Sequence, residues 1–155
     1  MRLSDIMVFD AIVPELEATT RDEAIAELVN ALASAGALAK KNVQEVIKAV
    51  LGRETQATTG IGKGVALPHA KLEGIKKPIG TIGRSSAGID FSSLDSKNVY
   101  SVILLLSSPN NADEHLQAME TIFKHVQRDI FRKFLRQSET KEAIVDLIQE
   151  ADELS

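Results

Sequence analysis

Apolar residues recur at helical spacing near the start of the chain. Between positions 20 and 35 they occupy one helical face, at Ala24, Ile25, Leu28, Val29 and Leu32. Thr20 and Glu23 stand at the spacing of a capping box, and Gly36 is a natural residue to end a helix. The pattern therefore predicts a helix over residues 20–35.

Four further helices are predicted from the same kind of pattern. One covers residues 43–51, with Asn42 and Glu45 as a second capping box and Gly52 as its end. Another covers residues 112–127. Its expected buried stripe consists of Leu116, Met119, Ile122, Phe123 and Val126. Shorter helices are predicted over residues 129–135 and 141–150.

The middle of the chain has a different sequence pattern, in which short β-prone runs alternate with glycines. Strand candidates cover residues 65–67, 79–83 and 99–106. The last contains five consecutive apolar residues, which indicates a strand buried on both faces by helices. The order of helices, mixed strands and helices predicts an α/β fold. We expect an α/β sandwich with a mixed (parallel and antiparallel) sheet of about five strands flanked by helices.

Length and composition limit the classes of function that this chain can have. The 155 residues predict a single domain over 1–155. The chain has no cysteine, which excludes disulfides, thiolate nucleophiles and cysteine-ligated metals. The net charge of −4 argues against nucleic-acid binding. No apolar run is long enough to span a membrane and no secretory signal is visible, so we expect a cytoplasmic protein with no direct membrane insertion.

His69 stands in the most informative context. It ends a block that begins at Gly60 and has further glycines at Gly62 and Gly64. Closely spaced glycines let successive backbone N–H groups converge on an anion. Pro68 restricts the backbone before the histidine, so we expect an exposed, stiffly held imidazole beside an anion-binding loop. Turn glycines followed by a solvated loop histidine are an equally good interpretation of the spacing alone.

Familiar phosphate and nucleophile motifs do not fit this block. A Walker A loop fails at Ala57 and at Gly64, where it needs glycine and a hydroxyl residue. A dinucleotide fingerprint fails because Val65 or Leu67 stands where its last glycine belongs. A nucleophile elbow fails at Ala87. The chemistry therefore has to come from the histidines and their neighbours.

Two further residues are candidates for the same site. His115 lies in the first turn of the predicted third helix, where the helix dipole favours a neutral imidazole; a capping-region surface histidine is the alternative. Arg53 could clamp a phosphoryl group, or could be an ordinary surface arginine beside Glu54. His125 is expected at the surface or at the boundary of the core, too far along the helix from His115 to share a metal.

Charge is unevenly distributed along the chain. Residues 60–84 carry five basic residues and one acidic residue, a balance of +4, in a chain of net charge −4. A locally basic segment in an acidic protein favours an anion site or an acidic partner, although many such segments are only solvated surface.

Three short segments carry a family resemblance. They are Arg53-Glu54, Thr58-Thr59-Gly60-Ile61-Gly62 and Ala66-Leu67-Pro68-His69. In this order they resemble the type-2 EIIA domain of the bacterial phosphoenolpyruvate-dependent phosphotransferase system, the fructose/mannitol class that includes the nitrogen-regulatory EIIA. A His115-Leu116 pair resembles the family's second element. The resemblance covers about residues 3–148.

The resemblance implies a definite chemistry. In this family the fold is an α/β sandwich, and the active histidine accepts a phosphoryl group from the phosphohistidine of HPr or an HPr-like carrier and passes it to an EIIB domain. By motif match the acceptor is His69, through Nε2, and His115 is the second active-site histidine, which would hydrogen-bond the phosphoryl group or His69. The phosphate-binding residues would be Arg53, Thr59, Gly60 and Gly62. Neither a metal nor another cofactor is implied.

Three outcomes remain open at this point. The chain could cycle as a phosphoryl carrier, or act as a regulator whose phosphorylation state selects its protein partner, or be a degenerate module that has lost transfer. The absence of a fused EIIB or EIIC segment favours the nitrogen-regulatory type. The sequence does not identify a sugar.

Overall fold

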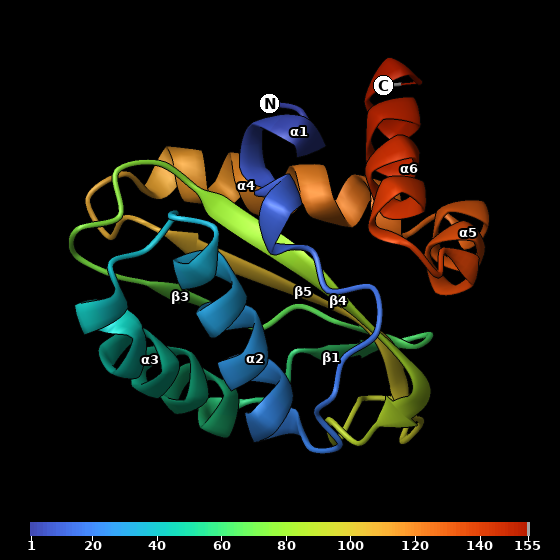
Figure 1. Ribbon diagram of the computed structural model, residues 1–155, viewed down its shortest axis with the longest axis horizontal. Helices are drawn as coiled ribbons and strands as arrows, with labels where there is room; N and C mark the ends of the chain where they lie inside the picture. The colour runs from blue at the N-terminus through green and yellow to red at the C-terminus, as the bar shows by residue number, and fades with distance from the viewer. Residues whose placement is uncertain (155) are drawn as a thin grey trace.

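The computed structural model describes residues 1–154 and shows one sheet with helices on both faces (Figure 1). Helices α2 (Arg21–Ser34) and α3 (Val43–Gln56) cover one face. The other face is covered by α1 (Leu3–Ile6), α4 (Ala112–Val126), α5 (Asp129–Gln137) and α6 (Lys141–Glu153). Two 3₁₀ turns connect the first helices: η1 (Phe9–Ala11) lies between α1 and α2, and η2 (Lys40–Asn42) lies between α2 and α3. The predicted α/β sandwich is confirmed.

The sheet is organised around β5 (Val99–Ser107), and it is mixed as predicted. Along one edge, β4 (Ile79–Ile89) runs antiparallel to β5. Along the other edge, β2 (Val65–Ala66) and β3 (His69–Lys71) follow each other, both parallel to β5. Finally, β1 (Gly60–Gly62) pairs with β2. The three short strands β1, β2 and β3 thus lead the chain from the glycine block into His69.

Two hydrophobic cores lie on opposite sides of the sheet. Alternate residues of β5 enter different cores, as strand geometry requires: Leu104 packs towards α2 and α3, whereas Leu105 packs towards α4 and α6. Both are fully buried. This confirms that the continuous apolar run is a strand covered on both faces.

Several predicted helix ends need correction. Gly36 has a φ of +82° and ends α2 as expected. By contrast, α3 continues four residues beyond Gly52 to Gln56, because an exposed glycine costs a helix only about 1 kcal/mol. The Asn42 side chain does not cap α3, since Asn42 belongs to η2 and already has helical backbone angles.

The predicted stripe of α4 is confirmed at four of its five residues: Ile122 and Val126 are buried, and Met119 and Phe123 pack against the same core. Leu116 is the exception. Leu116 is 56% exposed, whereas His125, expected at the surface or at the boundary of the core, is 2% exposed. The helix points Ala118, Ile122 and His125 inward. Leu116 lies about 200° around the helix from Ala118, which leaves its side chain on the outer face.

Among residues 1–154, no helix combines the length and hydropathy that a membrane span requires.

Candidate active site

His69 opens β3 on a backbone that is pinned on both sides. The N–H of Leu67 donates to the carbonyl of Thr59 at 3.0 Å, and the carbonyl of Pro68 accepts from Leu105 at 3.0 Å. The Nδ1 atom of His69 lies 2.8 Å from the carbonyl oxygen of Leu67. Because a carbonyl only accepts, Nδ1 carries the proton, and Nε2 of the neutral ring keeps its lone pair. The imidazole is half-buried, not exposed as expected.

The second histidine of the site comes from α4. The ring centroids of His115 and His69 are 6.0 Å apart, with the ring planes tilted by 43°. Nδ1 of His115 hydrogen-bonds the hydroxyl of Ser107, the last residue of β5. The side chain of Asn111 caps α4 by accepting from the Glu114 N–H at 3.0 Å. The cap and the Ser107 hydroxyl together fix where His115 stands.

Both imidazoles are held towards their neutral form. Burial lowers the pKa of His69, and the positive charge of Arg53 lowers this pKa further against the opposing effect of the hydrogen bond to Leu67. Burial also lowers the pKa of His115, with the positive charge of Lys71 acting in the same direction. The prediction of a neutral His115 is therefore supported, with desolvation as the main cause.

These side chains share one open cleft of about 570 Å³ between α3, β3 and α4. It is lined by Ala49, Gly52, Arg53, Gln56, His69, Ala70, Lys71 and His115. Arg53 stands in the last turn of α3, where Nη1 donates to the carbonyl of Ala57 at 2.9 Å. The cleft therefore combines two neutral imidazoles with two cations, a set suited to a phosphoryl group.

The remaining predicted phosphate-binding residues lie outside this lining. Thr59 is buried, and both its hydroxyl and its N–H donate to the carboxylate of Glu54, at 2.6 and 2.7 Å. Gly60 packs so tightly against Ser93 that an added Cβ would lie 2.3 Å from the serine Oγ. Gly62 has a φ of +95°, and an added Cβ would lie 3.4 Å from the carboxylate of Asp95. The glycines thus serve close packing and a turn, and a phosphate-binding role for these three residues stays a prediction.

Three residues of the site were not singled out from the sequence. Lys71 follows His69 by two positions, and strand alternation places both side chains on the same face. Ser107 positions His115, and Gln56 lines the cleft. Once β3 is known to be a strand, the two-residue spacing indicates that Lys71 lies beside His69. No feature of the sequence indicates that Ser107 contacts His115.

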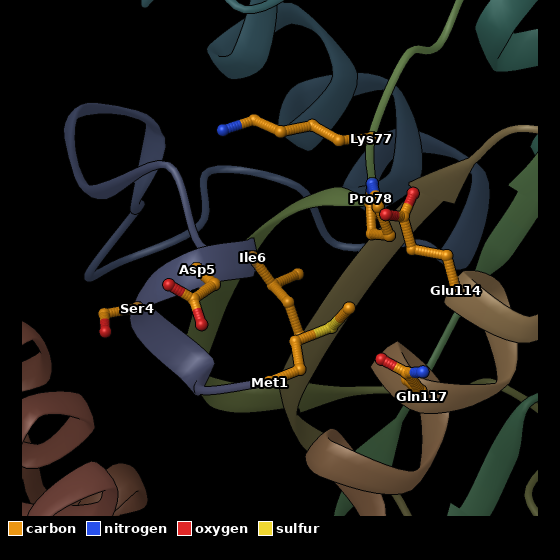
Figure 2. A pocket seen from close by; sticks show the side chains of 8 residues that line it. All are labelled: Met1, Ser4, Asp5, Ile6, Lys77, Pro78, Glu114 and Gln117. Carbon is orange, nitrogen blue, oxygen red and sulfur yellow. The ribbon is translucent and has the colours of Figure 1, made fainter.

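A second hollow lies beside α1 (Figure 2). It is lined by Met1, Ser4, Asp5, Ile6, Lys77, Pro78, Glu114 and Gln117. It contains no histidine, and Lys77 is its one cationic side chain beside the carboxylates of Asp5 and Glu114, so it is not suited to phosphoryl transfer. Within residues 1–154 no three His, Asp or Glu side chains are grouped so that they could hold a metal ion.

Comparisons with known proteins agree with the geometry. Residues 7–151 match the family model "Phosphoenolpyruvate-dependent sugar phosphotransferase system, EIIA 2". The chain is 34% identical over 148 residues to a nitrogen regulatory protein of Bradyrhizobium diazoefficiens, covering 96% of this chain and 95% of that protein. It is 32% identical over 152 residues to the fructose-specific EIIABC component of Bacillus subtilis, covering 98% of this chain but only 24% of that longer protein.

Solved structures show the same fold. The nitrogen regulatory protein IIA-Ntr from Neisseria meningitidis superposes with a TM-score of 0.83 at 24% identity, covering 94% of this chain and 98% of that one. The mannitol enzyme IIA of Escherichia coli, solved in complex with phosphorylated enzyme IIB, gives a TM-score of 0.74 at 19% identity, covering 91% of this chain and 95% of that one. The chain belongs to the type-2 EIIA family of the phosphoenolpyruvate-dependent phosphotransferase system.

Proposed function

We propose that His69 accepts a phosphoryl group on Nε2 from the phosphohistidine of HPr or a nitrogen-type HPr. The observation that carries the proposal is the hydrogen bond from Nδ1 to the Leu67 carbonyl. It commits one ring nitrogen to the backbone, and the lowered pKa keeps the other unprotonated near neutral pH. The remaining nucleophilic atom, Nε2, belongs to a side chain that lines a cationic cleft.

The transfer needs positioning more than acid–base chemistry. The Nε2 lone pair forms the new N–P bond while the N–P bond of the donor phosphohistidine breaks, and the donor imidazole keeps that electron pair. Arg53 and Lys71 offset the negative charge of the transferred group. When Ser107 donates to Nδ1 of His115, Nε2 of His115 carries a hydrogen that can be donated to a phosphoryl oxygen.

For the fate of the phosphoryl group, we favour a regulatory output of the nitrogen type over sugar transport. The match to a nitrogen regulatory protein over nearly the full length of both chains supports this choice. Transfer to an EIIB domain is the other route, and the mannitol enzyme IIA has been solved with its phosphorylated enzyme IIB. Phosphorylation adds about −1.5 to −2 charge to the cleft, enough to change which partner surface fits it.

Mass spectrometry tests whether His69 is the phosphoryl acceptor. Wild type and His69→Ala would be incubated with phosphoenolpyruvate, Enzyme I and either HPr or its nitrogen-type counterpart. We expect one acid-labile, base-stable phosphoryl group on the wild type and none on the variant. Labelling of His69→Ala would overturn the assignment. No labelling of the wild type by either donor would favour a degenerate binding module.

A second measurement separates transport from regulation. Phosphorylated wild type would be mixed with a fructose-class EIIB domain, and loss of the label would be followed over time. A label that persists, together with a partner affinity that changes on phosphorylation, supports the regulatory output. Rapid draining of the label into EIIB would contradict it.

A further inference from the structure

A second basic cleft, of about 680 Å³, lies away from the histidines. It is lined by Lys63, Arg84, Asp129, Arg132, Lys133, Arg136, Gln137 and Glu139. Five cations and two carboxylates give a formal +3 in a chain of net charge −4. Arg84 pairs with Ser101 near the start of β5, whereas His69 pairs with Leu105 near its end, roughly 13 Å along the strand. Figure 1 shows α5 at the opposite end of the molecule from β3.

The cleft contains a fixed, nearly buried positive charge. The Arg84 side chain is only 8% exposed. Its Nε donates to the carbonyl of Arg136 at 2.7 Å, and its Nη1 donates to that of Pro14 at 3.0 Å. Glu15 lies 3.7 Å from Nη1, but its carboxylate also accepts from Ser86. Within residues 1–154 the Nη2 donors have no hydrogen-bond partner.

Four more cations line the cleft beside Arg84. Arg132 is already engaged, because it pairs with Asp129 and donates to the carbonyl of Val126. The other three lie at the rim. The guanidinium of Arg136 stacks 3.6 Å above the ring centroid of Tyr100, which restrains it, and Lys133 is exposed one turn earlier on α5. Lys63 comes from the turn between β1 and β2 with a φ of 59°, a left-handed conformation that favours glycine. In the described part of the chain, no carboxylate lies within 4.0 Å of any of these three cations.

We propose that this cleft binds a small molecule that carries a diphosphate group. Guanidinium groups match phosphate oxygens well, and the cleft offers the Nη2 group of Arg84 from β4 and the guanidinium of Arg136 from α5. One phosphate carries about −1.5 to −2 charge, so a formal +3 matches two phosphates better than one. The volume lies within the roughly 300–1,000 Å³ typical of ligand sites. The proposal stands on these side chains alone and does not depend on phosphorylation of His69.

Inorganic pyrophosphate is the probe, titrated against inorganic phosphate at 150 mM salt with amide NMR as the readout. The variant Lys133→Gln/Arg136→Gln removes two rim charges, and Lys40→Gln/Lys41→Gln removes two exposed charges elsewhere. We expect pyrophosphate to shift amides of α5 and of residues 62–64, and to bind more tightly than phosphate. The rim variant should bind about tenfold or more weakly, because charge-assisted hydrogen bonds are lost. The control variant should change binding by about twofold or less.

The active-site cleft can also attract these anions, and residue-specific shifts separate the two sites. The Arg53→Gln variant removes a cation from the active-site cleft only, so the α5 shifts should persist in it. The proposal would be overturned if pyrophosphate binding weakened equally in the rim and control variants, or if the shifts were confined to Arg53, His69 and Lys71. Arg84 would then be a structural residue that joins α5 to the loop at Pro14. Neither outcome bears on whether His69 is labelled.

Discussion

His69 and His115 face one cleft with their ring centroids 6.0 Å apart, yet no hydrogen bond joins the two rings in the described part of the chain. Each ring instead has its Nδ1 committed elsewhere, one to the Leu67 carbonyl and the other to the Ser107 hydroxyl. His115 is therefore not arranged to orient or deprotonate His69. Its remaining nitrogen is available to a group that lies between the rings, such as a transferred phosphoryl group.

From this arrangement we expect His115→Ala to slow phosphorylation of His69 by roughly 10- to 100-fold without abolishing it, since one donor to a developing charge is lost while the nucleophile remains. Rapid-quench measurement of labelling from a phosphorylated HPr-type donor checks this. Asn111→Ala, which removes the cap of α4 but no imidazole, is the control for helix stability. A rate equal to that of the wild type would remove His115 from the site.

Ser107→Ala tests how His115 is positioned. Losing one hydrogen bond costs about 0.5–1.5 kcal/mol, so the rate should fall by about 2- to 10-fold, less than in His115→Ala. Nitrogen NMR should show that the imidazole has lost its preferred tautomer. Ser108→Ala serves as the neighbouring control. Ser107 would have no positioning role if the tautomer and the rate were unchanged.

The pH dependence of phosphorylation follows from the lowered pKa of His69. Because burial and Arg53 favour the neutral ring, Nε2 stays unprotonated below the ordinary value of about 6.5. The rate constant should still exceed half of its plateau value at pH 6.5 and should reach half only at a lower pH. A pH profile of labelling, combined with an NMR titration of the His69 ring, measures this. A midpoint at or above 6.5 would contradict the burial argument.

The sequence predicted those parts of the molecule that depend on local pattern. The apolar run of β5 indicated a buried central strand, and Pro68-His69 indicated a stiffly held imidazole. The strands β1 and β3, with three residues each, are too short to carry a period of their own. Lys71 and Ser107 were therefore missed, because their relation to the histidines depends on how β3 and α4 meet at the end of β5.

Burial of polar residues was the other point that pattern did not reveal. Glu54 is 2% exposed and accepts two hydrogen bonds from Thr59, although it reads as a surface neighbour of Arg53. The reason is that α3 continues beyond Gly52, which carries Glu54 onto the face that packs against the start of β1. A helix end misplaced by one turn thus changes the environment of a charged residue completely.

This buried pair yields a stability prediction. Glu54→Ala leaves the N–H of buried Thr59 without its carboxylate, so it should lower the free energy of unfolding by about 2–3 kcal/mol. Urea denaturation of Glu54→Ala, Thr59→Val and the double variant should give a coupling energy of about 1 kcal/mol or more. Glu45→Ala, an exposed glutamate of the same helix, is the control. Additive effects of the two changes would mean that the pair is not coupled.

Asp152 of α6 ties the two ends of the chain together, and its pKa makes that link sensitive to acid. Its carboxylate accepts from the N–H groups of Leu3 and Ser4 at 2.7 and 3.0 Å, and from the Ser4 hydroxyl at 2.7 Å. Burial alone would raise its pKa, but the hydrogen bonds from Ser4 and Leu3 and the charge of Arg2 together hold that pKa below its ordinary value. The ionised form is therefore favoured in the folded protein.

A carboxylate whose pKa is lower in the folded than in the unfolded chain stabilises the fold above the unfolded value of about 3.9, and this stabilisation is lost as the pH falls through the folded value. Asp152→Asn should therefore cost about 1–3 kcal/mol of unfolding free energy at pH 7, and the difference from wild type should shrink towards pH 3. Urea denaturation at both pH values, with the exposed Asp146→Asn on the same helix as control, measures it. A cost that stays constant with pH would show that the charge of Asp152 contributes nothing beyond the shape of its side chain.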